Sequence, residues 1–355
     1  MEIRNPKSEI RRKPEGRSPR GRPDARRRFG FRIFLRSVVS LFALAIPIHS
    51  RADEPAPAPF RIGFSSACFT EVNENDGKAA VKVWAQALAR ERGIPADPQP
   101  RILKGVGEIA GALTNKLVDA INLTTEEYWA LHGQVALNQS IFSVRDNAIE
   151  EEYVLLVHRA SGLQRLADLH GRSVGIHQGP RAALAQAWLE TLLLQEGFGF
   201  TTNFFGRIVL VPKITKVVLP VFFRQMDACV VTRKGFETMI ELNPQTGQQL
   251  KTLAVSPPVG PFLFCFRADY VSPIRTQIIG EIGNWHTTPA GRQILTIFQC
   301  EGLAERPIAA INSTLELLTT HAKLSAATNL VQSQRLCEAT NAVPAGKLLD
   351  QAAAK

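Results

Sequence analysis

The chain has 355 residues, with 42 Lys and Arg against 32 Asp and Glu, which gives a formal net charge of +10. Residues 1–52 hold 14 of the basic and four of the acidic residues, so residues 53–355 keep 28 of each and have no net charge (42 minus 14, and 32 minus 4). A nucleic-acid-binding domain needs a basic face, and this balanced body gives no global support for one.

Residues 1–52 have the features of an export signal. A basic segment precedes an apolar run at 37–48, and Ser50-Arg51-Ala52 places small residues where signal peptidase requires them. A run of twelve residues is too short to cross a bilayer, which takes about 20. We therefore expect cleavage after Ala52 and a periplasmic product, with a short membrane anchor as the alternative. Arg26-Arg27-Arg28-Phe29 resembles a twin-arginine signal without its Leu, so the sequence leaves the export route open.

Residues 53–59 predict a disordered spacer, because repeated Pro blocks both helix and sheet. The rest of the chain is long enough for two lobes with a core each. Its cysteines, which show no zinc or redox spacing, are Cys68, Cys229, Cys265, Cys300 and Cys337. Cys229 and Cys265 lie in apolar strands, as core residues do, and an oxidising compartment allows a bridge between Cys300 and Cys337.

Strands and helices are predicted to alternate from residue 60 onward. A strand at 61–65 leads into an amphipathic helix at 78–92, which ends at Gly93. A strand at 100–103, a helix at 106–117 and a strand at 120–123 follow. Thr124-Thr125-Glu126-Glu127 then begins a helix with a capping sequence. An apolar strand at 154–158 lies near the point where the chain is expected to change lobe.

The same plan recurs later in the chain. Gly63 and Gly175 lie in short apolar strands 112 residues apart, and the Asp-Ala pairs that open later strands, at Asp119 and Asp227, are 108 residues apart. Strands that alternate with helices are typical of parallel sheets, and the ligands of such sheets bind beyond the carboxyl ends of the strands. The repeat therefore predicts two α/β lobes that face each other across a cleft.

The segment 161–175 predicts a short helix, a Gly turn and a strand. Its run Leu166-Ala167-Asp168-Leu169-His170-Gly171-Arg172-Ser173-Val174 resembles the hydrophobic-x-Asp-Leu-x-Gly-(Lys/Arg)-x-Val run of type 2 periplasmic substrate-binding proteins. With the export signal and the two Asp-Ala strands, the chain from Phe60 to about Gly302 resembles the phosphate/phosphite/phosphonate-binding group of ABC transporter components. The resemblance implies an α/β fold with two lobes, each a mostly parallel sheet flanked by helices, and a ligand cleft between them.

The resemblance also divides the chain. Lobe 1 is expected at 60–153 and again at 254–306, lobe 2 at 154–253, and a C-terminal helical extension at 307–355. Residues 254–261 resemble the crossover that returns to lobe 1. The extension is either extra packing for a lobe or a docking surface for a partner.

Proteins of this group capture a solute without chemistry and hand it to a membrane permease. The resemblance thus implies a monomer that binds a small phosphonate-like or phosphate-like anion, with no catalytic residue, cofactor or metal. An anion suits a strand that feeds directly into a helix, because backbone N–H groups and the positive end of the helix dipole face it. The candidate contacts are Ser65, Ser66, Thr124, Thr125 and Tyr128 in lobe 1, and His177, Gln178, Gly179, Arg181 and Asp227 in lobe 2.

Each candidate has a structural alternative. Thr124 and Thr125 are also suited to cap their helix, Tyr128 to pack in a core, and His177 to end a strand. Arg181 is otherwise a solvated residue of a first helical turn, and Asp227 a structural residue rather than the partner of an amine-bearing phosphonate.

The start of the second-lobe helix departs from the family pattern. Phosphonate binders usually have Ser or Thr there, whereas this chain has His177-Gln178-Gly179-Pro180-Arg181. An Arg still suits an oxyanion, since it binds one in bidentate fashion, but the hydroxyl cage is missing. A carboxylate, a sulfonate or a neutral heterocycle therefore stays open as the ligand.

Two other functions fit the same fold. An enzyme would need a nucleophile with a base, and Cys68 has no His nearby in the sequence. A periplasmic sensor that reports its ligand to a receptor would use the same cleft, so the sequence leaves transport and sensing open.

Overall fold

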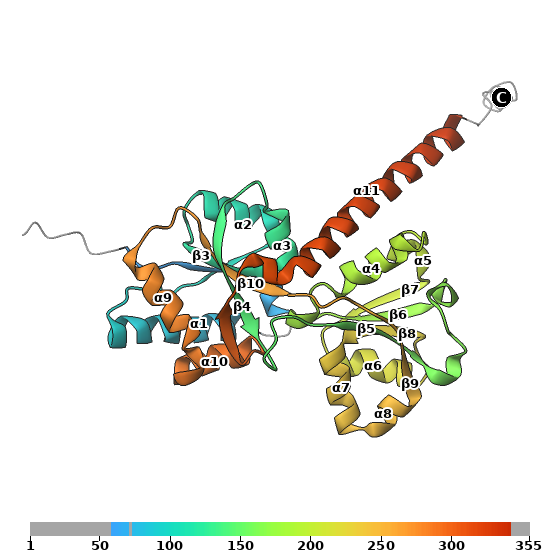
Figure 1. Ribbon diagram of the computed structural model, residues 1–355, viewed down its shortest axis with the longest axis horizontal. Coiled ribbons are helices and arrows are strands. Elements are labelled where there is room, and N and C mark those ends of the chain that lie inside the picture. The colour runs from blue at the N-terminus through green and yellow to red at the C-terminus, as the bar shows by residue number, and fades with distance from the viewer. Residues whose placement is uncertain (1–57, 71–72, 342–355) are drawn as a thin grey trace, which may run out of the picture. The chain divides into compact units, whose positions relative to one another are not determined.

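The computed structural model describes residues 58–70 and 73–341. The predicted export signal, the spacer up to residue 57 and the end of the C-terminal extension lie outside the described residues. Two mixed sheets form the framework (Figure 1). The first contains β1 (Ile62–Ser65), β2 (Arg101–Leu103), β3 (Ala120–Thr124), β4 (Leu137–Val144), β10 (Phe262–Arg267) and β11 (Gly302–Glu305). The second contains β5 (Tyr153–His158), β6 (Ser173–His177), β7 (Arg207–Val211), β8 (Ala228–Thr232) and β9 (Leu250–Val255). We call these sheets and their helices lobe 1 and lobe 2.

Each sheet is parallel on one side and antiparallel on the other. In lobe 1, β1 runs parallel to β2 and β3, whereas β10 runs antiparallel to β3 and β4. In lobe 2, β6 runs parallel to β7 and β8, and β5 runs antiparallel to β8 and β9. The expected two-lobed α/β fold is confirmed, but the sheets are mixed rather than mostly parallel. The strands that follow the two crossovers, β5 and β10, run antiparallel to their neighbours β8 and β3. The alternation of strands and helices in the sequence does not show these directions.

Helices cover both faces of each sheet. In lobe 1 these are α1 (Glu74–Ala87), α2 (Gly105–Thr114), α3 (Thr125–Ala130), α9 (Pro273–Gly283) and α10 (Pro289–Ile297). In lobe 2 they are α4 (Ala185–Gln195), α5 (Thr201–Phe204), α6 (Ile214–Phe222), α7 (Arg233–Leu242) and α8 (Pro244–Gln249). Figure 1 shows α1, α9 and α10 on one side of the first sheet and α2 and α3 on the other. The buried apolar side chains fall into separate clusters on the two faces of each sheet.

The sequence repeat has a structural cause. The Asp119 carboxylate accepts hydrogen bonds from the backbone N and the guanidinium of Arg61, which precedes β1. The Asp227 carboxylate likewise accepts bonds from the backbone N and Oγ of Ser173, at 2.8 and 2.6 Å, at the start of β6. In both lobes the Asp thus joins the amino ends of two parallel strands.

The repeated glycines belong to the same arrangement. A Cβ on Gly63 would lie 3.2 Å from Val118, and a Cβ on Gly175 would lie 2.8 Å from Met226. Val118 and Met226 directly precede the two aspartates. The recurring Gly and Asp therefore have one packing cause. The side chain that precedes each Asp lies against the Gly of the neighbouring strand, where a larger residue would not fit.

The C-terminal extension is a helix, α11 (Asn312–Asn341), that begins between the lobes. Leu317 and Leu318 are buried in the core of lobe 2, and Leu315 packs on the core of lobe 1. Trp129 of α3 donates its indole N–H to Thr319 Oγ1, and His321 lies 3.1 Å from Glu190 of α4. The first turns of α11 are therefore packing for both lobes, and Figure 1 shows the helix continuing past α4.

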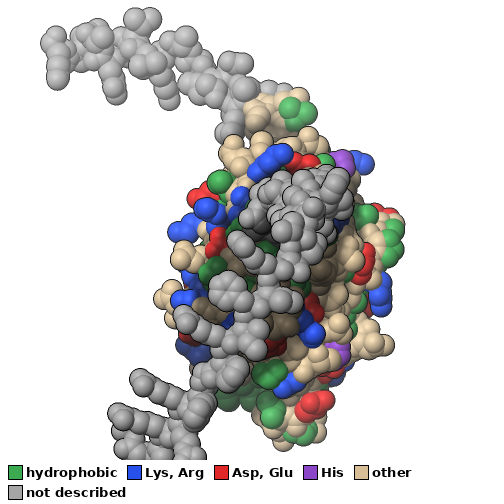
Figure 2. Space-filling model, turned by 90° about the vertical axis from the view of Figure 1, so that its left-hand side faces the viewer, with side chains coloured by type: hydrophobic (Ala, Val, Ile, Leu, Met, Phe, Trp, Pro, Cys, Tyr) green, Lys and Arg blue, Asp and Glu red, His purple; other side chains and the backbone are tan. Residues whose placement is uncertain are grey.

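The surface shows no field of one sign on the face in Figure 2. Where that face is visible, Lys and Arg are interspersed with Asp and Glu. This agrees with the zero net charge of residues 53–355. Within 58–70 and 73–341, the helices are all too short or too polar to cross a bilayer.

Candidate functional site between the lobes

Two crossovers connect the lobes and pair with each other. Residues 145–152 run from β4 to β5, and residues 256–261 run from β9 to β10. Glu151 and Val259 exchange backbone hydrogen bonds of 2.7 and 2.8 Å where the crossovers meet. Nearby, the 3₁₀ turn η1 (Ser66–Phe69) of lobe 1 contacts the 3₁₀ turn η5 (Pro180–Ala182) of lobe 2. Both turns follow the carboxyl end of a strand, which is where ligands of such sheets bind.

A polar pocket of about 220 Å³ lies at this meeting of the lobes. Lobe 1 contributes Ala67, Thr70, Thr124, Glu126 and Glu127, and lobe 2 contributes Ile176, His177, Gln178, Gly179, Ala182, Ala183 and Gln186. The structure thus brings four of the predicted contacts together: Thr124, His177, Gln178 and Gly179. Sequence reasoning missed the pocket roles of Glu126 and Glu127, because the capping sequence that contains them was interpreted only as a helix start.

The lobe 1 wall is a hydrogen-bonded unit built on Glu127. Its carboxylate accepts from Ser65 Oγ at 2.6 Å and from the backbone N of Thr124 at 2.9 Å, and Thr124 Oγ1 in turn accepts from the backbone N of Glu127. This reciprocal capping box begins α3, as predicted. Ser65 is fully buried, and its Oγ also accepts from the N–H of Ala67 at 3.1 Å. Its hydroxyl therefore positions Glu127 from behind the pocket surface.

This wall is acidic. Neither Glu126 nor Glu127 forms an ion pair with any Lys, Arg or His within the described residues. Burial raises the pKa of Glu126. The electrostatic influence of His321 partly offsets this rise, and the nearby Glu127 adds to it. A dianion placed against this wall would be repelled, since like charges a few ångströms apart disfavour each other.

Three other predicted contacts of lobe 1 lie elsewhere. Thr125 is fully buried and donates its hydroxyl to the carbonyl of Gly260, which ties α3 to the second crossover. Tyr128 lines two other hollows, one formed with residues 132–137 and one with residues 137–140 and 305–308. Burial raises the pKa of its hydroxyl. Ser66 begins η1 but does not line the polar pocket. The structure therefore places none of these three side chains in the pocket.

The lobe 2 wall follows directly from β6. His177, the last residue of the strand, is buried, and its Nε2 lies 3.1 Å from the carbonyl of Pro212. A carbonyl can only accept, so Nε2 carries the proton. Gln178 is exposed, and its backbone N–H is bonded to Val211. Its side-chain amide is thus an accessible polar group of this wall, as is that of the exposed Gln186.

Arg181 is buried rather than solvated. Its side chain is 6% exposed, its Nε donates to Glu151, whose side chain is 3% exposed, and its carbonyl accepts from the Tyr153 hydroxyl at 3.1 Å. The Nη2 group is buried and has no hydrogen-bond partner among the residues that the structure describes. The guanidinium therefore joins lobe 2 to the first crossover and keeps its Nη2 amino group available.

Asp227 lies at the wrong end of the sheet for ligand contact. It precedes β8, which runs parallel to β6, so its carboxylate sits beside Ser173 at the amino ends of the strands. His177 and Gly179 follow the carboxyl end of β6. The expectation that Asp227 opens a strand toward the cleft is therefore wrong, because the direction of β8 places it at the opposite edge.

With this geometry established, comparison with known proteins identifies the family. The family described as ABC transporter, phosphonate, periplasmic substrate-binding protein matches residues 68–306, about two thirds of the chain. The chain belongs to this family. Its members are transport substrate-binding proteins, which are not enzymes, and the family implies a small-molecule ligand and a permease partner. A search of curated proteins gives no match.

Solved structures agree with the binding-protein fold. XAC2383 from Xanthomonas citri, determined bound to ATP, has a TM-score of 0.55 at 14% identity and covers 76% of this chain and 98% of its own. A binding protein component of an ABC phosphonate transporter from Pseudomonas aeruginosa has a TM-score of 0.52 at 13% identity, with 76% and 89% covered. At these identities the likeness concerns the fold alone.

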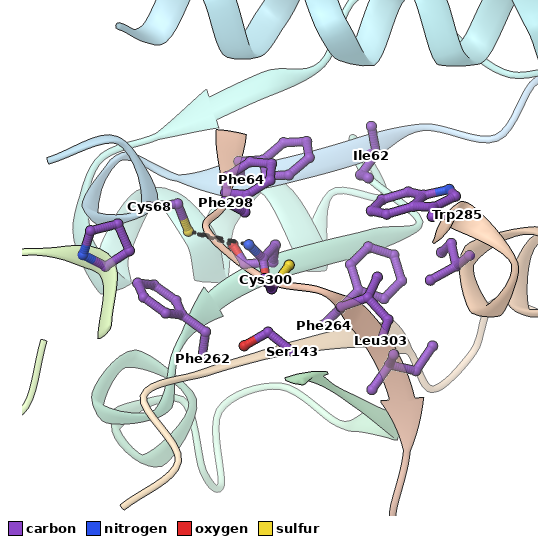
Figure 3. Close-up of a pocket in the computed structure, with 14 residues that line it drawn as sticks. Ile62, Phe64, Cys68, Ser143, Phe262, Phe264, Trp285, Phe298, Cys300 and Leu303 are labelled. Carbon is purple, nitrogen blue, oxygen red and sulfur yellow. Dashed lines mark hydrogen bonds between the residues drawn. The ribbon is translucent and has the colours of Figure 1, made fainter. Parts of the chain in front are cut away.

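An aromatic hollow of this phosphonate-family protein is formed by lobe 1 together with Pro180 of lobe 2. This aromatic cavity, about 50 Å³ in volume, is lined by Ile62, Phe64, Cys68, Asn122, Ile141, Ser143, Pro180, Phe262, Phe264, Ile282, Trp285, Phe298, Cys300 and Leu303. Figure 3 shows Phe64 and Phe298 on one side of it, Phe262 and Ser143 on the other, and Cys300 between them. An unfilled cavity of this size destabilises a protein by about 1 kcal/mol.

Among the side chains that the structure describes, Cys68, Cys229, Cys265 and Cys300 are free thiols. The side chain of Cys337, with which the sequence allows Cys300 to form a disulfide, lies outside the side chains that the structure describes, so that bridge stays a prediction. Burial raises the Cys300 pKa to about 11, although Arg181 lowers it in part. Burial and the charge of Glu127 raise the pKa of Cys68 well above its ordinary value. A nucleophilic cysteine needs a lowered pKa, so Cys68 has the opposite environment.

Proposed function

We propose that the mature protein captures a small anionic solute, of phosphonate or phosphate type, between its lobes and delivers it to the permease of an ABC transporter. The family match supports the transport role. The observation that carries the choice of an anion is the buried guanidinium of Arg181, whose Nη2 lacks a hydrogen-bond partner among the described residues. Guanidinium donors form strong, charge-assisted hydrogen bonds with oxyanions.

The ligand contacts in this proposal are Thr124, His177, Gln178, Gly179 and Arg181. Arg181 donates to the oxyanion; it belongs to the turn η5 of lobe 2, which contacts η1 of lobe 1. The Glu126 and Glu127 wall repels the anion, which orients it toward Arg181. Ser65 acts through Glu127, as the buried donor that fixes the carboxylate.

Ligand binding tests this proposal directly. We expect phosphate or a short alkylphosphonate to raise the melting temperature of the mature protein, since a ligand at 100 times its Kd adds about 2.7 kcal/mol of stability. The double variant Glu151→Gln/Arg181→Met removes the guanidinium without leaving a buried carboxylate. It should bind at least about tenfold more weakly, in line with the 1–3 kcal/mol of a charged hydrogen bond. Arg165→Met, at an exposed ion pair with Asp168, is the control. Equal affinity in the double variant and the wild type would exclude Arg181 from the site.

Export is the second part of the proposal. The basic segment, the apolar run and Ser50-Arg51-Ala52 support cleavage after Ala52 and a periplasmic mature form. The periplasmic fraction should contain a protein whose N-terminal residue is Asp53, as read by mass spectrometry of the intact chain. A product that keeps residues 1–52 in the membrane fraction would contradict export with cleavage.

A further inference from the structure

The helix α11 is anchored to the segment that connects the lobes. Ser313 Oγ, in its first turn, donates to the carbonyl of Pro258 at 2.6 Å, and Thr314 Oγ1 accepts from the backbone N of Gly260 at 2.9 Å. Pro258 and Gly260 belong to the second crossover, and Thr314 is fully buried. The start of α11 is therefore fixed to one of the two segments about which the lobes would move.

Two side chains farther along α11 reach one helix of each lobe. Thr319 Oγ1 accepts from the indole N–H of Trp129, in α3 of lobe 1, at 3.3 Å. His321 Nε2 lies 3.1 Å from Oε1 of Glu190, in α4 of lobe 2. An ionised carboxylate can only accept, so Nε2 is the donor. Figure 1 shows α11 running from α3 past α4, and it thus bridges these two helices by a bond to each.

The two bridged helices also carry residues that line the polar pocket. Glu126 of α3 lines it three residues before Trp129, and Gln186 of α4 lines it four residues before Glu190. Residues three or four apart lie on the same side of a helix. In both lobes the side of the helix that faces the pocket is therefore the side that α11 holds, about one turn farther along.

Apolar contacts fix α11 to both lobes as well. Leu317 and Leu318 are buried in the core of lobe 2, and Leu315 packs on the core of lobe 1. Because a helix is stiff and the start of α11 is bonded to the second crossover, α11 cannot follow both lobes if they separate. Opening of the polar pocket must therefore break the contacts of α11 with one lobe.

We propose that α11 is a clamp that sets the width of the polar pocket, with Thr319 and His321 as positioning residues. Their two bonds hold α3 and α4 at the spacing at which side chains of both lobes reach one solute. Without these bonds the lobes spend more time apart, and the affinity falls in proportion to the fraction of molecules that stays closed. The loss of affinity rests on the proposed function, whereas the change in lobe spacing does not.

Small-angle X-ray scattering and calorimetry on the mature protein test the clamp. Without ligand, Thr319→Val/His321→Leu should have a larger radius of gyration than the wild type. It should bind methylphosphonate about tenfold more weakly, the effect of losing one or two net hydrogen bonds. Thr319→Ser/His321→Gln keeps an acceptor and a donor and should restore both values. Ser333→Ala, which removes a hydroxyl bonded to Asn329 within α11, is the control and should change neither.

The outcomes separate the clamp from the proposed function. A double variant with the radius of gyration of the wild type overturns the clamp, and a loss of stability in urea without that change assigns both residues to packing. A larger radius with unchanged affinity for methylphosphonate overturns their positioning role. If the wild type does not bind methylphosphonate, the proposed ligand is wrong, and the scattering alone decides the clamp. If His321→Leu prevents folding, Thr319→Val alone decides by the same two measurements.

Discussion

Replacing Arg181 with Met is expected to destabilise the protein by about 3–5 kcal/mol, because it leaves the Glu151 carboxylate buried without a partner. Both side chains of this pair are almost fully enclosed, at 6% and 3% exposure. The backbone of Glu151 also exchanges two hydrogen bonds with Val259 of the other crossover. If the unpaired Glu151 side chain moved toward solvent, it would therefore disturb the connection between the lobes. Urea unfolding of Arg181→Met measures the loss.

The double variant separates charge from packing. Glu151→Gln/Arg181→Met should recover most of the lost stability, since replacing both members of a buried pair is often close to neutral. Arg165→Met, which removes an ion pair whose Arg side chain is 80% exposed, should change stability by less than about 1 kcal/mol. A double variant as unstable as Arg181→Met would mean that the arginine stabilises by packing and not by pairing.

The repeated aspartates should differ in their effect when each is replaced by Ala. Asp119→Ala is expected to cost about 3–5 kcal/mol, because it removes three bonds from Arg61 and leaves the buried Arg267 without this carboxylate. Asp227→Ala should cost about 1–3 kcal/mol, the range for bonds to a charged group, since its carboxylate accepts two bonds from Ser173, lies 3.9 Å from Nη1 of the half-exposed Arg172, and is itself 35% exposed. Equal losses in thermal or urea unfolding would contradict the assignment.

The Asp227 effect should also depend on pH. Burial raises the pKa of Asp227, but the hydrogen bonds from Ser173 outweigh burial and hold the pKa below its usual value. A carboxyl with a lowered folded pKa stabilises above its unfolded pKa and loses this contribution as the pH falls through the folded value. The difference between wild type and Asp227→Ala should therefore shrink as the pH falls below about 4. A difference that stays constant down to pH 2 would assign it to packing.

The candidate site was predictable where local chemistry decides. The capping box at Thr124 to Glu127 needs only residues three apart, and the turn after β6 needs only the strand and the Pro180 that follows it. Both were placed correctly along the chain, and Thr124, His177, Gln178 and Gly179 meet in one pocket. Thr125 and Tyr128 lie on the same short helix but not in the pocket: Tyr128 lines another hollow of lobe 1, and Thr125 donates to the carbonyl of Gly260. The orientation of the helix, which the sequence does not show, decides this.

The sequence by itself determined the α/β class, the two repeated halves and the family, because periodicity, capping and the Asp-Leu-x-Gly run depend on residues close along the chain. Only the tertiary structure decided that Arg181 pairs with Glu151, that Asp227 lies at the far edge of its sheet, and that α11 packs on both lobes. These outcomes depend on strand direction and on contacts between residues 30 or more positions apart. The same local pattern is compatible with several such arrangements, and burial of the two cores selects one of them.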